Sequence, residues 1–551
     1  MSSYNLIDKT DTRFETLKKG FNLRWPDQGY GADYIYVCNN SEDVLSAANA
    51  ALARNQRITV RSGGHCYEGF VSNKLAADGT TPLAIIDLSL LVGMDFSEHA
   101  DISSPWDISA KYKFRAASGN QNWDGTVNLY KLANRCIPGG SCYSVGAGGH
   151  ISGGGYGLLS RLHGLTVDWL SGVDILVPAA DGKSLLAKHV SLKSTGSDRD
   201  LFIACRGAGG GNFGIILNYY FAELPAAPEQ VYLLSLAWPW STFKDKAHLG
   251  QFLNSYWQWF NTHDSEWNSQ DITKANGGLF SLLKLQHRST GDIHLLIQYT
   301  GNNGRVDGSG QEKPFTDFVD SMTMAAGVVP DVVETGMTYG VVNAQAESKR
   351  KFKDAVSDAR LIDWLYATQT LNGSGDNQRG KYKSDQQIGN FGPTEITALW
   401  EGLNGADDPL LNQALVQIDS YGGCININDE TTNPTSVYQR SSLLKTQFQV
   451  YWTDKANDQY CINWMQKLYS ACFADQGGKP YGDDGRYQGC YINYPDTDMK
   501  YTAADHAKVD PKWLTLYYGD KAESLVKTKQ AVDPDNLFRH EMSIPLALPG
   551  K

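Results

Sequence analysis

Hydrophobic and polar positions in the first part of the chain alternate over short distances, which predicts short helices and strands. Residues 40–54 begin with four polar residues and then place apolar side chains at i, i+3, i+4, i+7 and i+8, the pattern of an amphipathic helix. A short strand is predicted at Arg57–Arg61, and the turn Ser62-Gly63-Gly64-His65 follows it. A strand that ends in a glycine turn can present backbone N–H groups to an anion. Similar patterns predict strands at 83–87, 112–117, 173–177 and 213–222, and a helix near 123–133.

From about residue 230 the periodic segments become longer, which indicates a second lobe. Helices are expected around 243–261 and 456–473, and strands at 278–287, 293–300 and 445–452. Two stretches that are rich in glycine and polar residues, 301–312 and 371–386, are predicted to be surface loops. The tail from residue 505 returns to helix, and its Lys521–Ala531 segment could pack on the first lobe.

Length, charge and hydropathy limit the kinds of molecule that the protein is expected to bind and where it is expected to act. The 551 residues exceed one ordinary domain. A net charge of -11 without a run of Lys and Arg disfavours nucleic acid and anionic membrane as partners. The chain has no stretch of 18 apolar residues, and Met1–Lys9 lacks the features of a signal peptide. The protein is therefore expected to be cytoplasmic, or secreted with a leader removed.

Cysteine usage predicts neither a disulfide framework nor a metal site. The nine cysteines are an odd number and are scattered without CxxC pairs. At least one thiol must therefore serve another purpose, even if that purpose is only packing.

The densest chemical signal is the segment from Ser141 to Gly157. It has seven glycines in the twelve residues Gly146–Gly157, so we expect neither a helix nor a packed strand there. Such a segment offers backbone that a flat or phosphorylated ligand can approach closely. Its spacing fits neither a Rossmann nor a P-loop motif. Taken alone, it is equally well interpreted as a glycine-rich surface loop.

Five motifs occur in order along the chain and together carry more information. They are Arg61-Ser-Gly-Gly-His65, Cys142-x-x-Val-Gly-x-Gly-Gly-His-x-Ser-Gly-Gly-Gly-Tyr-Gly157, Gly209-Gly-Gly-Asn-Phe-Gly-Ile215, Tyr491-Ile-Asn-Tyr494 and Asp533-Pro-x-Asn-x-Phe538. From residue 30 to 545 the chain resembles the berberine-bridge-enzyme-like branch of the vanillyl-alcohol oxidase and p-cresol methylhydroxylase flavoproteins. Within that branch the pattern is most similar to bacterial oxidases of sugars or glycosylated natural products, of the aclacinomycin-oxidoreductase type.

The resemblance implies an α+β fold with two lobes and FAD as the cofactor. Residues 1–228 and 488–551 would form the FAD-binding domain, and 229–487 a substrate domain built on an antiparallel sheet. The flavin should lie in the cleft between the lobes, where ligands often bind.

Two covalent bonds to the flavin are implied, from His65 to the 8α-methyl group and from Cys142 to C6. Cys136 is a rival thiol, but only Cys142 has the spacing of the motif before Gly146. Cys66 is better interpreted as a small buried side chain. A flavin held at two points cannot dissociate from a pocket that is open to a large substrate, and its redox potential is expected to be raised.

The resemblance also implies further contacts with the flavin. These involve Arg61, Ser62, Gly63, Gly64, Val145, Gly146, Gly148, Gly149, His150, Gly153, Gly154, Asn212, Gly214, Ile215 and Asn493. Val145 would border the face where O2 meets the reduced flavin, and its small side chain favours an oxidase over a dehydrogenase. Ordinary packing is the alternative role for Val145.

Tyr156 and Tyr491 occupy the positions of paired active-site tyrosines in the family. An alcohol needs a base for its O–H proton while hydride leaves its carbon for flavin N5, and a phenol serves only if its pKa is lowered. A positive charge could do this, but the sequence does not identify one. Tyr494 is the alternative base, although strand alternation would place it on the face opposite Tyr491 and Asn493.

In the second lobe, Leu444–Trp452 and the Trp-rich residues 256–259 are candidates for stacking on a sugar. The expected reaction is oxidation of an alcohol or hemiacetal of a carbohydrate or glycosylated metabolite, with O2 reduced to H2O2, by a monomer or homodimer. Three alternatives are a flavin dehydrogenase that reacts poorly with O2, a carbohydrate-binding relative without catalysis, and a fold that binds some other dinucleotide. The presence of both Tyr156 and Tyr491 argues against the second alternative.

Overall fold

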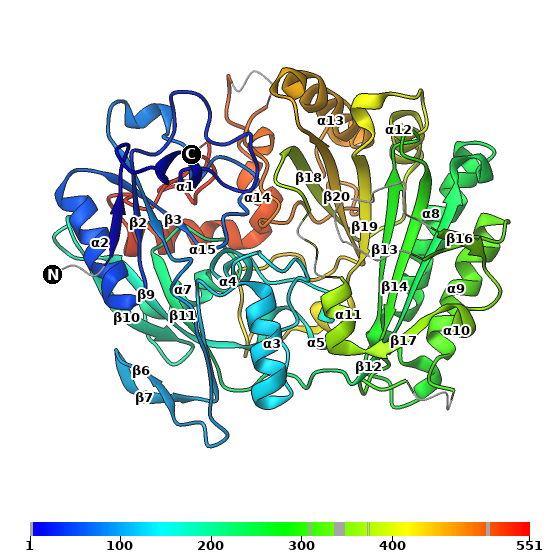
Figure 1. Ribbon diagram of the computed structural model, residues 1–551, viewed down its shortest axis with the longest axis horizontal. Coiled ribbons are helices and arrows are strands. Elements are labelled where there is room, and N and C mark those ends of the chain that lie inside the picture. The colour runs from blue at the N-terminus through cyan, green and yellow to red at the C-terminus, as the bar shows by residue number, and fades with distance from the viewer. Residues whose placement is uncertain are drawn as a thin grey trace.

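The computed structural model describes residues 4–306, 310–334, 348–371, 373, 375–502 and 507–550. They form two lobes, and both ends of the chain lie in the first one (Figure 1). This arrangement confirms the predicted α+β fold. One hydrophobic cluster continues from the first lobe into the second.

Two sheets form the first lobe. Their strands are β1 Asn5–Ile7, β2 Tyr34–Val37, β3 Arg57–Arg61, β4 Leu83–Asp87, β5 Met94–Phe96, β8 Phe114–Ala117, β9 Leu170–Pro178, β10 Leu185–Ser191 and β11 Ile215–Phe221. The four-stranded sheet has the order β1-β2-β4-β3, with β4 parallel to both β2 and β3. The five-stranded sheet is antiparallel with the order β10-β9-β11-β8-β5. A separate hairpin is formed by β6 Ile102–Ser104 and β7 Asp107–Tyr112.

The predicted first helix is α2, Ser41–Ala53, and its sequence explains both its start and its buried face. The side chain of Asn40 accepts a hydrogen bond from the Asp43 N–H at 2.9 Å, which caps the helix. Val44 and the alanines that follow at helical spacing are buried. The helix near 123–133 is α3, Asn122–Ala133.

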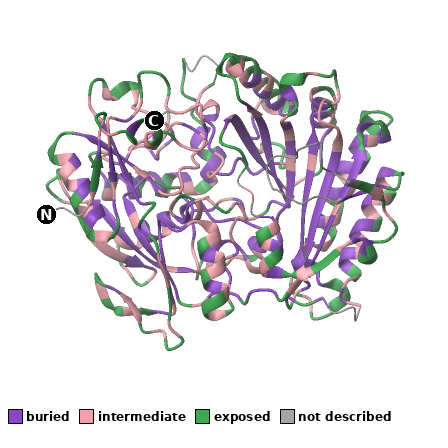
Figure 2. Cartoon of the chain, in the orientation of Figure 1, coloured by how far each residue is buried: buried purple, intermediate pink, exposed green. Residues whose placement is uncertain are grey.

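The second lobe is a large antiparallel sheet covered by helices. Its strands are β12 Gln230–Pro239, β13 Leu279–Gln286, β14 Asp292–Tyr299, β15 Asp331–Glu334, β16 Ser348–Lys351, β17 Arg360–Asp363, β18 Arg379–Gln387, β19 Ala414–Ser420 and β20 Leu444–Trp452. The order is β16-β15-β12-β14-β13-β19-β20-β18, and β17 pairs with β12. Figure 1 shows helices on the outer side of this sheet, among them α8 Lys246–His263, α9 Lys313–Ala326, α12 Pro393–Leu403 and α13 Asp458–Cys472. The strands of the sheet are mostly buried (Figure 2).

The prediction of a surface loop at 371–386 was wrong, because β18 begins within it and is buried. Hydropathy suggests a loop since the strand carries charged side chains. Those charges are paired in the interior, where Lys381 donates to Glu68 at 3.0 Å and Lys383 to Asp498 at 2.7 Å. Within the other predicted loop, 301–312, the described residues form no helix or strand, and 307–309 lie outside the described residues.

The expectation that the glycine-rich segment forms no helix was wrong, because it contains the short helix α4, Ala147–Ser152. Close packing of backbone explains it. A Cβ atom on Gly148 would lie 3.0 Å from the carbonyl oxygen of Ser118 and 3.0 Å from Cβ of Ser62. Glycine therefore allows this helix to lie directly against the neighbouring chain segments.

The C-terminal tail packs on the first lobe, as expected. It contains α14 Trp513–Tyr518 and α15 Ala522–Val532, and α15 contacts α7, Ser197–Cys205. The buried Lys529 ammonium donates to the carbonyl of Asn212 at 2.7 Å, which connects the tail to the third glycine motif. Among the described residues, no helix is both long and apolar enough to cross a membrane.

Candidate active site

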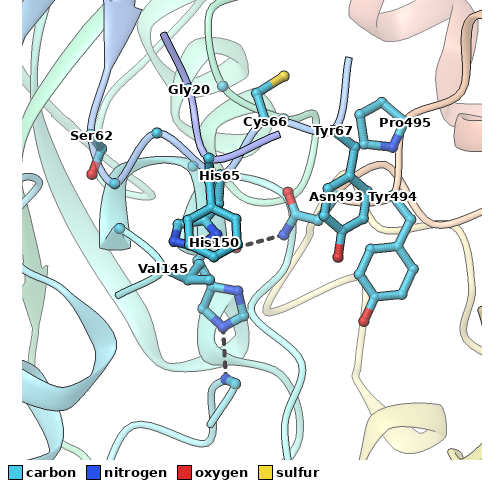
Figure 3. A pocket seen from close by; sticks show the side chains of 18 of the residues that line it. Gly20, Ser62, His65, Cys66, Tyr67, Val145, His150, Asn493, Tyr494 and Pro495 are labelled. Carbon is cyan, nitrogen blue, oxygen red and sulfur yellow. Dashed lines mark hydrogen bonds between the residues drawn. The ribbon is translucent and has the colours of Figure 1, made fainter. Parts of the chain in front are cut away.

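One cavity of about 440 Å³ lies between the two lobes, and Figure 3 shows part of its lining. Its first-lobe wall is rich in glycine backbone and also carries large side chains such as Phe21, Phe70 and His540. The glycines are Gly63, Gly64, Gly140, Gly146, Gly148, Gly149 and Gly209–Gly211. Its second-lobe wall is made of side chains from four strands: Phe280, Leu282, Lys284, Tyr382, Leu415, Gln417, Asp419, Gln447, Gln449 and Tyr451.

Most residues predicted to contact the flavin line this cavity. They are Arg61, Ser62, Gly63, Gly64, His65, Cys142, Val145, Gly146, Gly148, Gly149, His150, Asn212, Gly214 and Asn493, together with Tyr156, Tyr491 and Tyr494. Gly153, Gly154 and Ile215 are not among the lining residues. Gly153 instead makes room for a neighbour, since a Cβ there would lie 2.0 Å from the Asn493 side-chain oxygen, and Ile215 is buried at the start of β11.

The turn after β3 and the loop that follows Cys142 interlock through two glycines. A Cβ on Gly63 would lie 2.2 Å from the backbone nitrogen of Gly146 and 2.7 Å from the carbonyl oxygen of Ser144. Both atoms belong to the backbone and cannot move aside as a flexible side chain could. The close approach brings His65 and Cys142 to the same cavity although 76 residues separate them in sequence.

His65 is held on one ring face and at one ring nitrogen. Its Nε2 lies 2.8 Å from Oγ of Ser144, and the ring of Phe21 stacks on it with centroids 4.2 Å apart. Burial lowers the pKa of His65 to about 4, so the imidazole is neutral at pH 7. A neutral imidazole has a nitrogen lone pair available for bond formation.

The cysteines differ in position. Cys142 lines the cavity, and its carbonyl accepts a hydrogen bond from the Asn122 side chain at 3.2 Å. Cys136 is buried elsewhere, with its thiol near the carbonyl of Ala226 at 3.6 Å. Cys66 also borders the cavity, but its sulfur points away from the His65 ring (Figure 3). Burial raises the pKa of the Cys142 thiol to about 11, opposed by the charge of Lys284.

Three polar residues of the flavin motifs form hydrogen bonds with other groups of the protein itself. The Arg61 guanidinium pairs with the buried Asp87 carboxylate at 2.8 Å, so its charge holds β3 to β4. His150 accepts a hydrogen bond from the Gly140 N–H at 2.8 Å, and burial lowers the pKa of its ring to about 4. Asn493 donates to the His150 carbonyl at 2.9 Å, a bond drawn in Figure 3.

Tyr491 and Tyr494 both face the cavity, which corrects the expectation that they lie on opposite faces. The segment is a turn closed by the Tyr494 N–H and the Tyr491 carbonyl at 2.9 Å, and strand alternation does not apply to it. The two rings meet edge to face with centroids 5.1 Å apart. The Tyr156 hydroxyl donates to the Ser420 carbonyl at 2.6 Å, so this phenol is bound to the second lobe.

Lys445 on β20 is the positive charge that the sequence did not identify. Its buried ammonium lies 2.7 Å from the Asp419 carboxylate and donates to the Tyr494 hydroxyl at 3.1 Å. It also lies 4.5 Å from the ring centroid of Tyr156 and 5.8 Å from that of Tyr491. One ammonium therefore contacts all three predicted tyrosines.

Burial raises the pKa of the three tyrosines by different amounts. Burial raises the pKa of Tyr156 and of Tyr494 well above the usual value of a phenol. It raises the pKa of Tyr491 less, because the Lys445 charge and a hydrogen bond donated by Asn493 at 3.0 Å both favour the phenolate. Tyr491 is thus, of the three, the tyrosine whose phenolate forms most readily and can then accept a proton.

A connected row of polar side chains runs along β20 beside these tyrosines. Gln447 donates to the Tyr67 hydroxyl at 2.9 Å, Gln449 donates to Gln447 at 2.9 Å, and Tyr451 donates to Gln449 at 2.7 Å. On β19, Gln417 donates to Asp419 at 2.9 Å. Their alternate spacing along a strand is a signal that could have indicated them in the sequence.

Of the two segments proposed to stack on a sugar, only β20 forms part of the cavity. The Trp-rich residues 256–259 belong to α8 on the opposite side of the sheet, where Trp257 donates to the Ile388 carbonyl at 2.9 Å and Trp259 packs on Phe318. The stacking role proposed for 256–259 was wrong. The tryptophans fill the space between helices and sheet, as aromatic residues at helical spacing usually do.

The glycine wall fits a large planar, phosphorylated cofactor. No atom lies within 4 Å of the position where a Cβ would stand on Gly149, although this residue borders the cavity. Any other residue would put a side chain into that space. Residues 32–185 match the FAD binding domain family, and residues 490–545 match the berberine and berberine like family. The fold and site therefore define an FAD-dependent oxidoreductase of the vanillyl-alcohol oxidase type.

Proteins that are similar to this chain over nearly their whole length show which family within this class it belongs to. The chain is 34% identical to hexose oxidase of Chondrus crispus, with 98% of this chain and 94% of that protein covered. It is 32% identical to aclacinomycin-N/aclacinomycin-A oxidase of Streptomyces galilaeus, with 98% and 89% covered. The crystal structure of aclacinomycin oxidoreductase superposes with a TM-score of 0.79 at 30% identity, covering 98% and 99%. The chain belongs to the berberine-bridge-enzyme-like family of FAD-linked oxidoreductases.

Proposed function

We propose that this protein is an oxidase that converts an alcohol or hemiacetal group of a carbohydrate or glycosylated natural product, with FAD bound covalently by His65 and Cys142. Residues 1–228 and 488–551 would bind the flavin, and 229–487 the substrate. Two relatives support the substrate class, since one is a hexose oxidase and the other oxidises aclacinomycins. The relatives are similar along nearly their whole length, which includes the second lobe.

The observation that carries the proposal is the pairing of two walls around one cavity. His65, Cys142 and the glycine backbone lie on one side, and the row of Gln and Asp side chains lies on the other beside the tyrosines. Amide and carboxylate groups that alternate as donors and acceptors match the several hydroxyl groups of a sugar. An apolar aglycone alone would make no use of the further donors and acceptors that this row offers to the cavity.

Protein residues would supply binding and proton transfer. When bound, FAD supplies the acceptor for the electrons of the substrate C–H bond and passes them to O2, which gives H2O2. Tyr491 would take the hydroxyl proton in its phenolate form, which the Lys445 charge and the hydrogen bond from Asn493 stabilise. Tyr156 is bound to the Ser420 carbonyl and would orient the substrate. Gln447 and Gln449 would bind ring hydroxyls.

Whether the protein acts as an oxidase or as a dehydrogenase depends on the access of O2 to the flavin, which Val145 would control. Val145 borders the cavity next to the Cys142 loop, and its N–H donates to the Cys142 carbonyl at 3.3 Å. We propose that this small side chain leaves O2 access to the flavin. Peroxide formed per substrate oxidised in air, compared with dye reduced without air, tests this part of the proposal.

A substrate screen tests the main proposal. Free hexoses, oligosaccharides and glycosides are mixed with the protein under anaerobic conditions, and bleaching of the flavin absorbance is recorded. We expect bleaching by at least one carbohydrate or glycoside. If none bleaches the flavin while a simple aromatic or aliphatic alcohol does, the proposed substrate class is wrong.

A further inference from the structure

Ser144 stands at the ring nitrogen of His65 that a bond to flavin through the other nitrogen would leave unsubstituted. The Ser144 hydroxyl lies 2.8 Å from Nε2, and Phe21 covers one ring face with centroids 4.2 Å apart. Among the described residues, none forms a hydrogen bond to Nδ1 of His65. The ring is therefore fixed in its plane and at one edge, and its Nδ1 edge is left available at a residue that lines the cavity.

Close packing of the backbone fixes the position of Ser144 relative to His65. Gly63 and Gly146 bring the turn and the loop so close that a Cβ on Gly63 would lie 2.7 Å from the Ser144 carbonyl oxygen. The Phe21 N–H donates to the Gly64 carbonyl at 2.9 Å, which holds the stacked ring beside the same turn. His65, Ser144 and Phe21 are thus held by three segments that pack on each other through backbone atoms.

We propose that Ser144 is a positioning residue for covalent attachment of the flavin: it holds the His65 ring at Nε2 before and after the reaction, so that Nδ1 forms the bond. This inference rests on the attachment at His65 proposed above. A serine hydroxyl can accept a hydrogen bond from Nε2–H before the bond forms and donate one to Nε2 afterwards. No residue with a single hydrogen-bonding role can do both.

When Nδ1 forms the bond, the His65 ring must lose the proton on Nε2, the nitrogen that Ser144 contacts. The Nδ1 lone pair forms the bond to the 8α carbon, the methyl group loses one proton, and the imidazole loses its Nε2 proton. The electron pair released goes to the flavin and then to O2, which takes up both protons to give H2O2. Ser144 lies at the nitrogen from which one of these protons must leave.

The experiment uses the full-length chain, produced without flavin and then mixed with FAD in air. Cys142→Ala leaves His65 as the one attachment residue, and flavin that stays with the acid-precipitated protein is measured over time. Adding Ser144→Ala should slow attachment on the order of 10²-fold, the lower range for positioned proton transfer. Ser144→Thr should restore the rate, and Ser141→Ala, in the same loop, should leave it unchanged.

A second background separates this role from general support of the loop. In His65→Ala, where Cys142 is the one attachment residue, Ser144→Ala should leave the attachment rate unchanged. NMR of the flavopeptide from Cys142→Ala should show the linkage at Nδ1. The inference is overturned by equal rates with and without Ser144 in the Cys142→Ala background, by equal slowing in both backgrounds, or by linkage at Nε2. If the wild-type chain itself releases its flavin in acid, the attachment proposal fails at its root.

Discussion

The first-lobe wall of the cavity is rich in glycine backbone, whereas the second-lobe wall is mostly long polar side chains on β13, β18, β19 and β20. Backbone atoms that pack directly on each other allow almost no change, so the first wall suits a ligand that is always the same, the cofactor. Side chains that alternate on a sheet can be exchanged one at a time without moving the backbone. The second wall therefore suits a ligand that differs among relatives, the substrate.

The backbone wall should tolerate the least change. We expect Gly63→Ala to abolish folding or flavin incorporation, because the added Cβ would lie 2.2 Å from the Gly146 nitrogen. The ratio of flavin to protein and circular dichroism measure this effect. Gly149→Ala is the matched control: its Cβ has no atom within 4 Å, so the protein should fold but incorporate less flavin. Normal flavin content in Gly63→Ala would contradict the account of this wall.

Tyr491, the proposed general base, borders the cavity. Tyr491→Phe should slow anaerobic reduction of the flavin by ~10²- to 10⁴-fold, because general-base catalysis is lost, and the flavin should stay bound. Stopped-flow measurement of flavin absorbance gives the rate. Tyr494→Phe should have a smaller effect, since the pKa of Tyr494 is raised further and its hydroxyl already accepts from Lys445. If Tyr494→Phe is the slower variant, the base is Tyr494.

Lys445 should act through the pKa of Tyr491. A phenol must lose its proton to act as a base, so the rate of flavin reduction should rise with pH. The Lys445 charge lowers the pKa of Tyr491 against the effect of burial, so Lys445→Met should shift this rise to higher pH. Lys445→Arg keeps the charge and should keep the profile. An unchanged profile in Lys445→Met would show that the charge does not tune the base.

The side-chain wall should show the smallest effects. Gln447→Leu is expected to raise KM for a sugar by about five- to tenfold with little change in kcat, the value of about one net hydrogen bond. Steady-state kinetics with peroxide detection measure both constants. Thr446→Val changes the preceding residue of β20, whose side chain lies on the opposite face of the sheet, and should leave KM unchanged. Equal KM in Gln447→Leu and wild type would exclude Gln447 from sugar binding.

The same contrast explains what could be predicted from sequence. Glycine motifs are local, so the sequence alone pointed to His65, Cys142 and most glycines of the first wall, and these residues line one cavity. Their contacts with the flavin stay a prediction. Lys445 and Asp419 were missed because their charges are buried on different strands and meet only through strand pairing. For the same reason β18, whose lysines pair with carboxylates from other segments, was predicted to be a loop. Long-range ion pairing leaves no local pattern.

Acid precipitation tests the central proposal most directly. The native protein, denatured in acid, should keep its yellow colour in the pellet, because His65 and Cys142 both bond the flavin. His65→Ala and Cys142→Ala should each retain the colour through the remaining bond, and the double variant should release it. A white pellet from the native protein, or a yellow pellet from the double variant, would contradict the account.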